Sequence, residues 1–258
     1  MARVLSALAL LPLVIATIWY LPPLATLVLA EVALLLAFRE FAALAAAYGA
    51  RPFGGVTMVG VAATAAAVAF DVTVVVLMAS VLTIGIVSLA TDRRGPRLLL
   101  DVASSLFPIL YLGLPIGAMV AVRMSFGREA LVLLLATIMV SDTAQYYGGR
   151  WLGRTRLAPA ISPKKTVEGA LFGLVAGTAV MLAIGIPGLD QSTIPARAVF
   201  GVAIVGLGIA GDLFESQLKR GAGVKDASGL IPGHGGVLDR IDSLLFAAPG
   251  FFLFLQLA

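Results

Sequence analysis

The sequence has no cysteine, a single histidine and few charged residues. Without cysteine, disulfides and cysteine-ligated metal sites are excluded, and the redox compartment is left undetermined. Charged residues make up 12% of the chain, whereas soluble proteins carry roughly 25%. Apolar residues make up 60%, and the mean hydropathy is +1.04. This balance excludes an ordinary soluble domain and indicates a bundle of membrane-spanning helices.

Nine apolar segments approach the length of about 20 residues that a membrane span requires. They lie near residues 4–20, 23–48, 55–70, 72–91, 99–121, 129–147, 168–187, 194–215 and 243–257. The run from Gly54 to Ala90 is too long for one crossing, because at about 1.5 Å per residue it exceeds a hydrocarbon core of about 30 Å. Two passes that turn at Phe70 and Asp71 fit better. We therefore predict an all-α, polytopic membrane bundle of about nine transmembrane helices, forming one domain over residues 1–258.

The N-terminal segment resembles a secretory signal but lacks a small-x-small cleavage site. Its Trp19 and Tyr20 are typical of an interfacial anchor, so we interpret it as the first span.

The basic residues are distributed unevenly over the two sides of such a bundle. With nine spans, Arg123, Arg128 and Arg197 fall on one side, and the other 15 of the 18 lysines and arginines fall on the opposite side. The positive-inside rule places the richer side in the cytoplasm, together with the N-terminus. The expected location is a bacterial plasma membrane, with a polar site that faces the cytoplasm.

Three aspartates stand out in the polar segment from Ser216 to Asp242: Asp226, Asp239 and Asp242. Asp239 and Asp242 are three residues apart and would share one face of a helix. Hard divalent cations such as magnesium take carboxylate, phosphate and water oxygens. The alternative is that these aspartates cap a helix and pair with neighbouring cations, but the glycines and cations around them favour a metal site.

The same segment contains a glycine-rich stretch and four cations. Glycines allow the backbone to approach a ligand closely and present N–H groups to phosphate, although many such loops are simple turns. Lys219, Arg220, Lys225 and Arg240 would neutralise a polyphosphate or, alternatively, mark the cytoplasmic interface by reaching lipid headgroups. We assign His234 a role in phosphate contact or positioning. The glycine-rich stretch holds Gly229, Pro232, Gly233, Gly235 and Gly236.

A second polar cluster runs from Ser141 to Gly169. Asp142 interrupts an apolar run, where an ionisable residue is costly and points to function. Ser162, Lys164 and Lys165 supply hydroxyl and ammonium groups just before a predicted helix, and Glu168 falls in its first turn. A basic loop followed by a well-capped helix explains this segment equally well.

The apolar segments also contain a glycine repeat and two acids close to Ser216. Gly169, Gly173 and Gly177 recur every four residues, which predicts close helix packing. Asp212 and Glu215 precede Ser216 on one helix face and would contribute to the same site.

The polar segment resembles the signature of the phosphatidate cytidylyltransferase (CDP-diacylglycerol synthase) family. The matching positions are Ser216, Lys219, Arg220, Lys225, Asp226, Pro232, His234, Gly235, Gly236, Asp239, Arg240 and Asp242. The upstream segments SDTAQYYGGR and SPKKTVEG, and Arg39-Glu40-Phe41, are also similar to that family. The resemblance runs through most of the chain and is weakest in the first span and from about 50 to 100.

The resemblance implies an enzyme that joins CTP to phosphatidic acid in a membrane and releases pyrophosphate and CDP-diacylglycerol. It implies Mg²⁺ at Asp226, Asp239 and Asp242, with a second, monovalent cation such as K⁺. Lys219 and Lys225 join these aspartates as expected catalytic residues. The expected substrate-binding residues are Ser216, Arg220, His234, Gly235, Gly236, Arg240, Asp142, Ser162, Lys164 and Lys165. The expected partners are CTP, phosphatidic acid and membrane lipids, without nucleic acid, and a homodimer is left open.

The chemistry suits such a site. The phosphate of phosphatidic acid is already an anionic nucleophile, so that attack on CTP needs charge neutralisation and alignment rather than a strong base. A CTP-dependent lipid or polyprenol kinase is the nearest alternative. A transporter that uses Glu31, Asp142 and Asp212 is a further alternative, although the charges gather on one face of the predicted bundle.

Overall fold

The computed structural model describes residues 2–91, 93, 95–184, 193–231, 233 and 235–257, with side chains from residue 10 onward. The chain divides into two compact units. The first unit consists of Met1–Ala121 and Gly221–Arg240, and the second of Val122–Arg220 and Ile241–Ala258. Each unit therefore combines two separate stretches of sequence.

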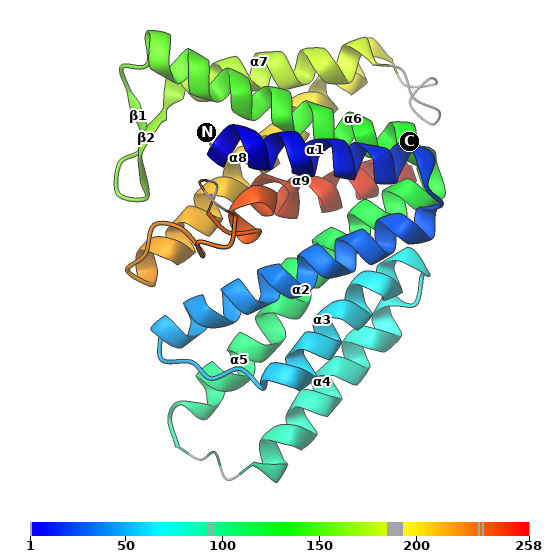
Figure 1. Ribbon diagram of the computed structural model, residues 1–258, viewed down its shortest axis with the longest axis vertical. Coiled ribbons are helices and arrows are strands. Elements are labelled where there is room, and N and C mark those ends of the chain that lie inside the picture. Colours follow the sequence, from blue (N-terminus) through cyan, green and yellow to red (C-terminus); the bar gives the residue numbers. More distant parts are fainter. Residues whose placement is uncertain are drawn as a thin grey trace. The chain divides into compact units, whose positions relative to one another are not determined.

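The first unit is helical. It contains α1 (Ala2–Tyr20), α2 (Pro23–Ala47), α3 (Gly54–Ala69), α4 (Thr73–Ala90), α5 (Leu98–Pro108), the π-helical turn η1 (Ile109–Gly113) and the start of α6 (Leu114–Leu152). Helices α2, α3 and α4 lie side by side (Figure 1). Their core includes Leu34, Phe41 and Val61, and the Phe107 ring packs between Phe41 and Tyr111 with centroid distances of 5.7 and 5.1 Å.

The π-helical turn follows Pro108 directly. Proline has no N–H to donate and its ring clashes with the preceding turn, so an α-helix commonly widens or bends there. Just beyond it, Gly113 and Gly117 allow the chain to approach α3. An added Cβ would lie 2.9 Å from the Val61 carbonyl oxygen and 2.7 Å from the Ala65 carbonyl oxygen. Both contacts are too short for any side chain.

A buried polar cluster fastens the connection between α2 and α3 to α5. The Asp101 carboxylate is 5% exposed; it accepts a hydrogen bond from the Arg51 N–H at 2.7 Å and pairs with Arg93 at 3.3 Å. The Ser105 hydroxyl accepts from the Phe53 N–H at 2.9 Å. These bonds satisfy backbone groups that the connection would otherwise bury without partners.

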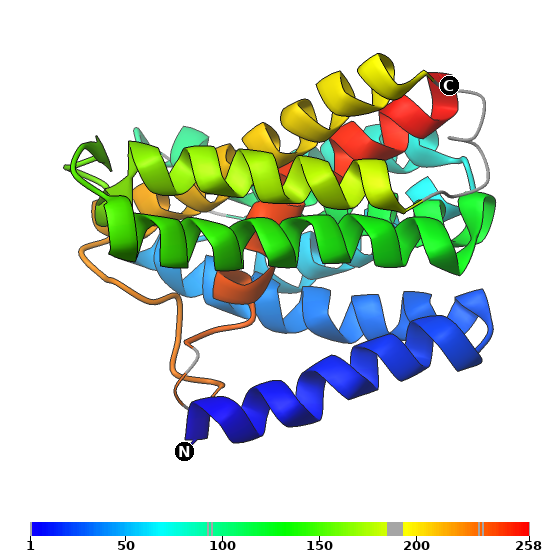
Figure 2. The same cartoon turned by 90° about the horizontal axis from the view of Figure 1, so that it is seen from above.

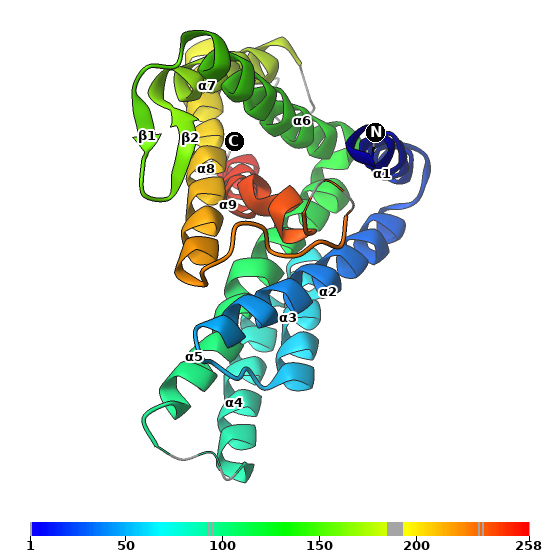
Figure 3. The same ribbon diagram turned by 60° about the vertical axis from the view of Figure 1, so that its left-hand side comes forward.

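The second unit contains the remainder of α6, a hairpin of β1 (Arg156–Ala158) and β2 (Ser162–Thr166), then α7 (Val167–Ala183), α8 (Ile194–Gly221) and α9 (Leu238–Leu257). Gly221 at the end of α8 and the first residues of α9 belong to the first unit. The strands are antiparallel, with Arg156 opposite Thr166 and Ala158 opposite Ser162. The hairpin connects the end of α6 to the start of α7 (Figure 3).

Helices α6 and α7 run side by side along the predicted glycine stripe (Figure 2). A Cβ at Gly169 would lie 2.7 Å from the Gln145 carbonyl oxygen, and one at Gly173 would lie 2.4 Å from the Gln145 Cγ. A Cβ at Gly177 would lie 2.5 Å from Val205 of α8. The prediction of close helix packing is confirmed.

Among the described residues, seven of the nine predicted apolar segments each correspond to one helix, with ends that differ by up to six residues. The two segments that fall in α5, η1 and α6 are separated by a break at Gly127, where φ is 91°. The predicted turn at Asp71 is also confirmed, with φ 58°. The hairpin was not predicted, because its short polar strands have no hydrophobic alternation to mark them.

Three helices among the described residues are long and apolar enough to cross a membrane: Thr73–Ala90, Leu98–Leu152 and Ile194–Gly221. The second comprises 55 residues, more than one crossing needs, and the break at Gly127 divides it. These helices support the interpretation of the chain as a membrane protein. The number of crossings, their orientation and the single domain stay predictions.

We expect Gly173→Ala to lower the free energy of unfolding by about 1–3 kcal/mol, because the new methyl group would overpack the α6–α7 contact. The matched control is Gly206→Ala on α8, where an added Cβ meets nothing within 4 Å and helix propensity improves. Thermal unfolding of both variants in detergent measures the difference. Equal midpoints would contradict close packing at Gly173.

Candidate functional site

The glycine-rich segment between α8 and α9 forms a loop that two carboxylates hold in place. One belongs to Asp239, in the first turn of α9. Its Oδ2 accepts hydrogen bonds from the Gly236 N–H at 2.7 Å and from the Ala227 N–H at 3.0 Å. These are the capping bonds that the alternative interpretation of Asp239 requires, and a metal-binding role for this residue stays a prediction.

The second carboxylate belongs to Glu40 of α2, which is 5% exposed. Its Oε1 accepts from the Ser228 hydroxyl at 2.6 Å and from the Val237 N–H at 3.0 Å. Its Oε2 accepts from the Leu238 N–H at 2.7 Å. Glu40 thus satisfies N–H groups at the start of α9, which have no partners inside the helix, and places a negative charge at the positive end of the helix dipole.

The sequence marks Glu40 as an acid of an apolar segment and as part of the family resemblance, but assigns it no role. The signal that could have found it is an acid within an apolar helix, where an unpaired charge is costly.

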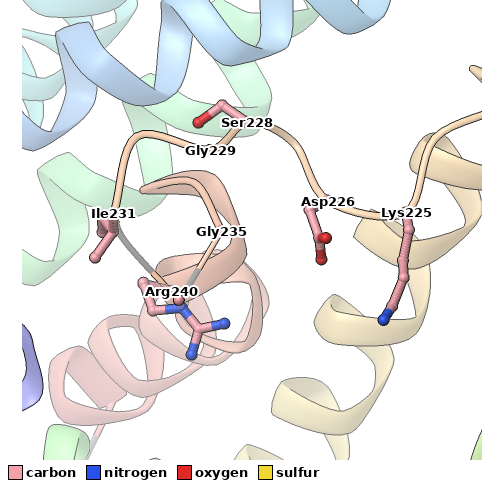
Figure 4. A pocket seen from close by; sticks show the side chains of 8 residues that line it. Lys225, Asp226, Ser228, Gly229, Ile231, Gly235 and Arg240 are labelled. Carbon is pink, nitrogen blue, oxygen red and sulfur yellow. The ribbon is translucent and has the colours of Figure 1, made fainter. Parts of the chain in front are cut away.

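The loop encloses a polar pocket of about 560 Å³, within the range of ligand sites. Lys225 and Asp226 extend from one side of the loop and Arg240 from the start of α9, and all three turn toward the same open space (Figure 4). The pocket brings together four predicted site residues: Lys225, Asp226, Gly235 and Arg240. The Lys225 and Arg240 cations around a polar space can bind an anion through charge-assisted hydrogen bonds.

Other predicted residues of this segment do not line the pocket or lie outside the described residues. Gly236 is buried, and an added Cβ would lie 2.5 Å from both carboxylate oxygens of Glu40. The glycine therefore makes room for Glu40. His234 and Pro232 lie outside the described residues.

In the second unit, α8 carries acids and cations that are paired within the protein. Lys219 forms an ion pair with Glu215, one turn earlier, and their side chains are 9% and 0% exposed. Asp212 forms an ion pair with Lys165 of β2, and the Ser216 hydroxyl donates to Asp212 Oδ1 at 3.4 Å. The predicted phosphate contacts Lys219 and Lys165 thus neutralise carboxylates in this structure.

The second unit also gathers more carboxylates than these two ammonium groups balance. Asp242 on α9 lies within electrostatic range of Asp212, Glu215 and Asp142. Asp142 on α6 accepts a hydrogen bond from the Gln145 amide at 3.0 Å. Four acids with two paired ammonium groups suit a hard divalent cation, which takes oxygen ligands. Within the described ranges, no three acidic or histidine side chains stand close enough to hold an ion by themselves.

The remaining predicted residues lie near the hairpin. The Arg220 guanidinium donates to the Ile161 carbonyl oxygen at 3.2 Å, Lys164 is exposed and Ser162 is half-buried. The start of α7 is capped as the alternative interpretation of this segment proposed. Thr166 Oγ1 accepts from the Gly169 N–H at 3.1 Å, and Glu168 accepts from the Arg154 and Thr155 N–H groups, each at 3.1 Å.

The three predicted metal-binding aspartates are divided between the units. Asp226 and Asp239 belong to the first unit and Asp242 to the second.

The sequence model of the Cytidylyltransferase family matches residues 1–258. The chain belongs to this family. The resemblance inferred from the segment Ser216–Asp242 is thereby confirmed.

Three curated relatives carry the name phosphatidate cytidylyltransferase. The protein of Helicobacter pylori is 40% identical over 148 residues, covering 57% of this chain and 55% of that protein. The protein of Synechocystis is 47% identical over 135 residues, covering 51% and 44%. The protein of Thermotoga maritima is 35% identical over 167 residues, covering 63% and 62%. The chain thus spans about half the length of the curated relatives it matches.

We expect Glu215→Gln or Lys219→Met alone to lower the free energy of unfolding by about 3–5 kcal/mol, because each leaves a buried charge without its partner. The double variant Glu215→Gln/Lys219→Met should recover most of that loss. Unfolding of the four proteins in detergent gives the coupling free energy. Additive losses would show that the pair is not an energetic unit.

Proposed function

We propose that this protein transfers the cytidylyl group of CTP to phosphatidic acid, giving CDP-diacylglycerol and pyrophosphate in a Mg²⁺-dependent reaction. The observation that carries the proposal is the polar pocket lined by Lys225 and Arg240, in a chain whose relatives are named phosphatidate cytidylyltransferase. We place the site on the cytoplasmic side of a multi-pass bundle, where CTP is available.

The cationic side chains are the proposed anion receptor. Helix N-termini often bind phosphate through their free N–H groups. Here the Val237 and Leu238 N–H groups donate to Glu40 and the Gly236 N–H donates to Asp239. Lys225 and Arg240 would therefore hold the phosphates of CTP through charge-assisted hydrogen bonds.

The transfer requires two anions to meet, and this requirement explains the residue types. A phosphate oxygen of phosphatidic acid attacks the α-phosphorus of CTP, and the bond to the pyrophosphate leaving group breaks. The nucleophile is ionised at neutral pH, so no side chain has to remove a proton. Positioning and charge neutralisation are the tasks left to the protein.

The acids of the second unit are the proposed environment of a magnesium ion. We propose that Asp242 is one ligand, near the charges of Asp142 and Asp212, that water and the phosphates of CTP supply the other oxygen ligands, and that a second, monovalent cation such as K⁺ takes part. Bound magnesium would neutralise phosphate charge and stabilise the departing pyrophosphate. Lys165 and Lys219 would keep the neighbouring carboxylates ionised and oriented.

We expect purified protein in detergent, given phosphatidic acid, magnesium and cytidine-labelled CTP, to place the label in the lipid phase. Removal of magnesium with a chelator should abolish the product, because the carboxylates would then repel the phosphates. A parallel reaction with γ-phosphate-labelled CTP is the control. Lipid labelled only from the γ-phosphate would indicate a kinase, and folded protein that labels no lipid would overturn the proposal and favour a transporter.

We expect Lys225→Ala and Arg240→Ala each to raise the KM for CTP by roughly 10- to 100-fold, since hydrogen bonds to charged groups are worth about 1.5–3 kcal/mol. Steady-state kinetics with varied CTP measures this. Arg128→Ala is the control, because Arg128 is an exposed arginine paired with Glu129. An unchanged KM in both pocket variants would remove the pocket from CTP binding.

A further inference from the structure

Glu40 holds three donors that come from separate points of the loop. Its partners Ser228, Val237 and Leu238 lie 188, 197 and 198 residues away in the sequence. Its bonds to Ser228 and Leu238 are short, and its carboxylate is buried. A single side chain of α2 thus holds the middle of the loop, at Ser228, and the start of α9, at Val237 and Leu238.

Both points are close in the sequence to charged residues of the pocket. Ser228 follows Lys225 and Asp226, and Leu238 precedes Arg240. In Figure 4 the Ser228 hydroxyl turns away from the space that Lys225, Asp226 and Arg240 share. Ser228, which lines the pocket, thus also connects it to Glu40.

A carboxylate is the group that this position requires. Glu40 accepts three hydrogen bonds through two oxygens and donates none. A glutamine would present an NH₂ group to one set of donors, and an aspartate would be one methylene too short. The space is filled, since even a Cβ at Gly236 would lie 2.5 Å from the Glu40 oxygens.

We propose that Glu40 is a positioning residue for nucleotide binding, which preforms the Lys225–Arg240 pocket without touching the ligand. The inference rests on the proposed function, because it takes CTP as the ligand of the pocket. When only a fraction of the protein holds a binding-competent loop, the apparent affinity falls by that fraction. Loss of the Glu40 carboxylate therefore weakens CTP binding, while the chemistry of bound CTP is retained.

The test is to measure KM and kcat separately in the Glu40→Gln variant. We expect the KM for CTP to rise about tenfold, with kcat changed by less than about threefold. Ser228→Ala removes one of the three bonds and should raise the KM by a smaller factor. The control is Glu31→Gln on the same helix, which should leave the KM at the wild-type value.

A second readout does not depend on catalysis. Trypsin cleaves after lysine, and Lys225 is exposed on the loop. We expect cleavage after Lys225 to be faster in Glu40→Gln than in wild type or Glu31→Gln, since the loop would open more often. Mass spectrometry of the fragments identifies the cleavage site.

The outcomes separate the two proposals. If wild type makes no CDP-diacylglycerol, the proposed function fails, and the rate of cleavage after Lys225 still tests whether Glu40 holds the loop. A Glu40→Gln protein with a lower unfolding midpoint but an unchanged KM and wild-type cleavage would overturn the positioning role. If Glu40→Gln does not fold, Ser228→Ala decides, and an unchanged KM and cleavage rate in that variant overturn it.

Discussion

The buried carboxylate of Glu40 is the constraint on which the candidate site depends. An ionised group away from water is costly unless hydrogen-bond donors surround it. In this protein those donors are the Ser228 hydroxyl and the first N–H groups of α9. The loop therefore closes on α2, and Lys225 and Arg240 come to line one pocket because their neighbours are held.

In the second unit, ion pairs reduce the cost of burying charged groups. Lys219 neutralises Glu215 within one helix, whereas Lys165 reaches Asp212 from the hairpin. Asp142 and Asp242 are two further acidic side chains near these pairs. The proposed cytidylyl transfer needs charge neutralisation more than proton transfer, which agrees with the cations that line the pocket of the loop.

Glycine serves different purposes in the two units, and its spacing alone does not distinguish them. Gly173 lets α7 approach α6, as its recurrence every four residues predicted. Gly236 was predicted as a backbone contact for phosphate, but it is buried, its N–H donates to Asp239, and its missing side chain leaves room for Glu40. The hairpin went unpredicted because strands as short as Arg156–Ala158 leave no periodic pattern.

The sequence by itself determined most of the helices, the turn at Asp71, the polar loop and the family, since each depends on local runs or on fixed spacing within one segment. Only the tertiary structure decided which charged groups meet. The sequence favoured a metal site at Asp239 over a helix cap, and the bond of Asp239 to the Ala227 N–H exists because the loop folds back. Glu40 and Ser228 are 188 residues apart, and no local pattern encodes such a contact. Chain packing brings these groups together, and the cost of burying an unpaired charge keeps them paired.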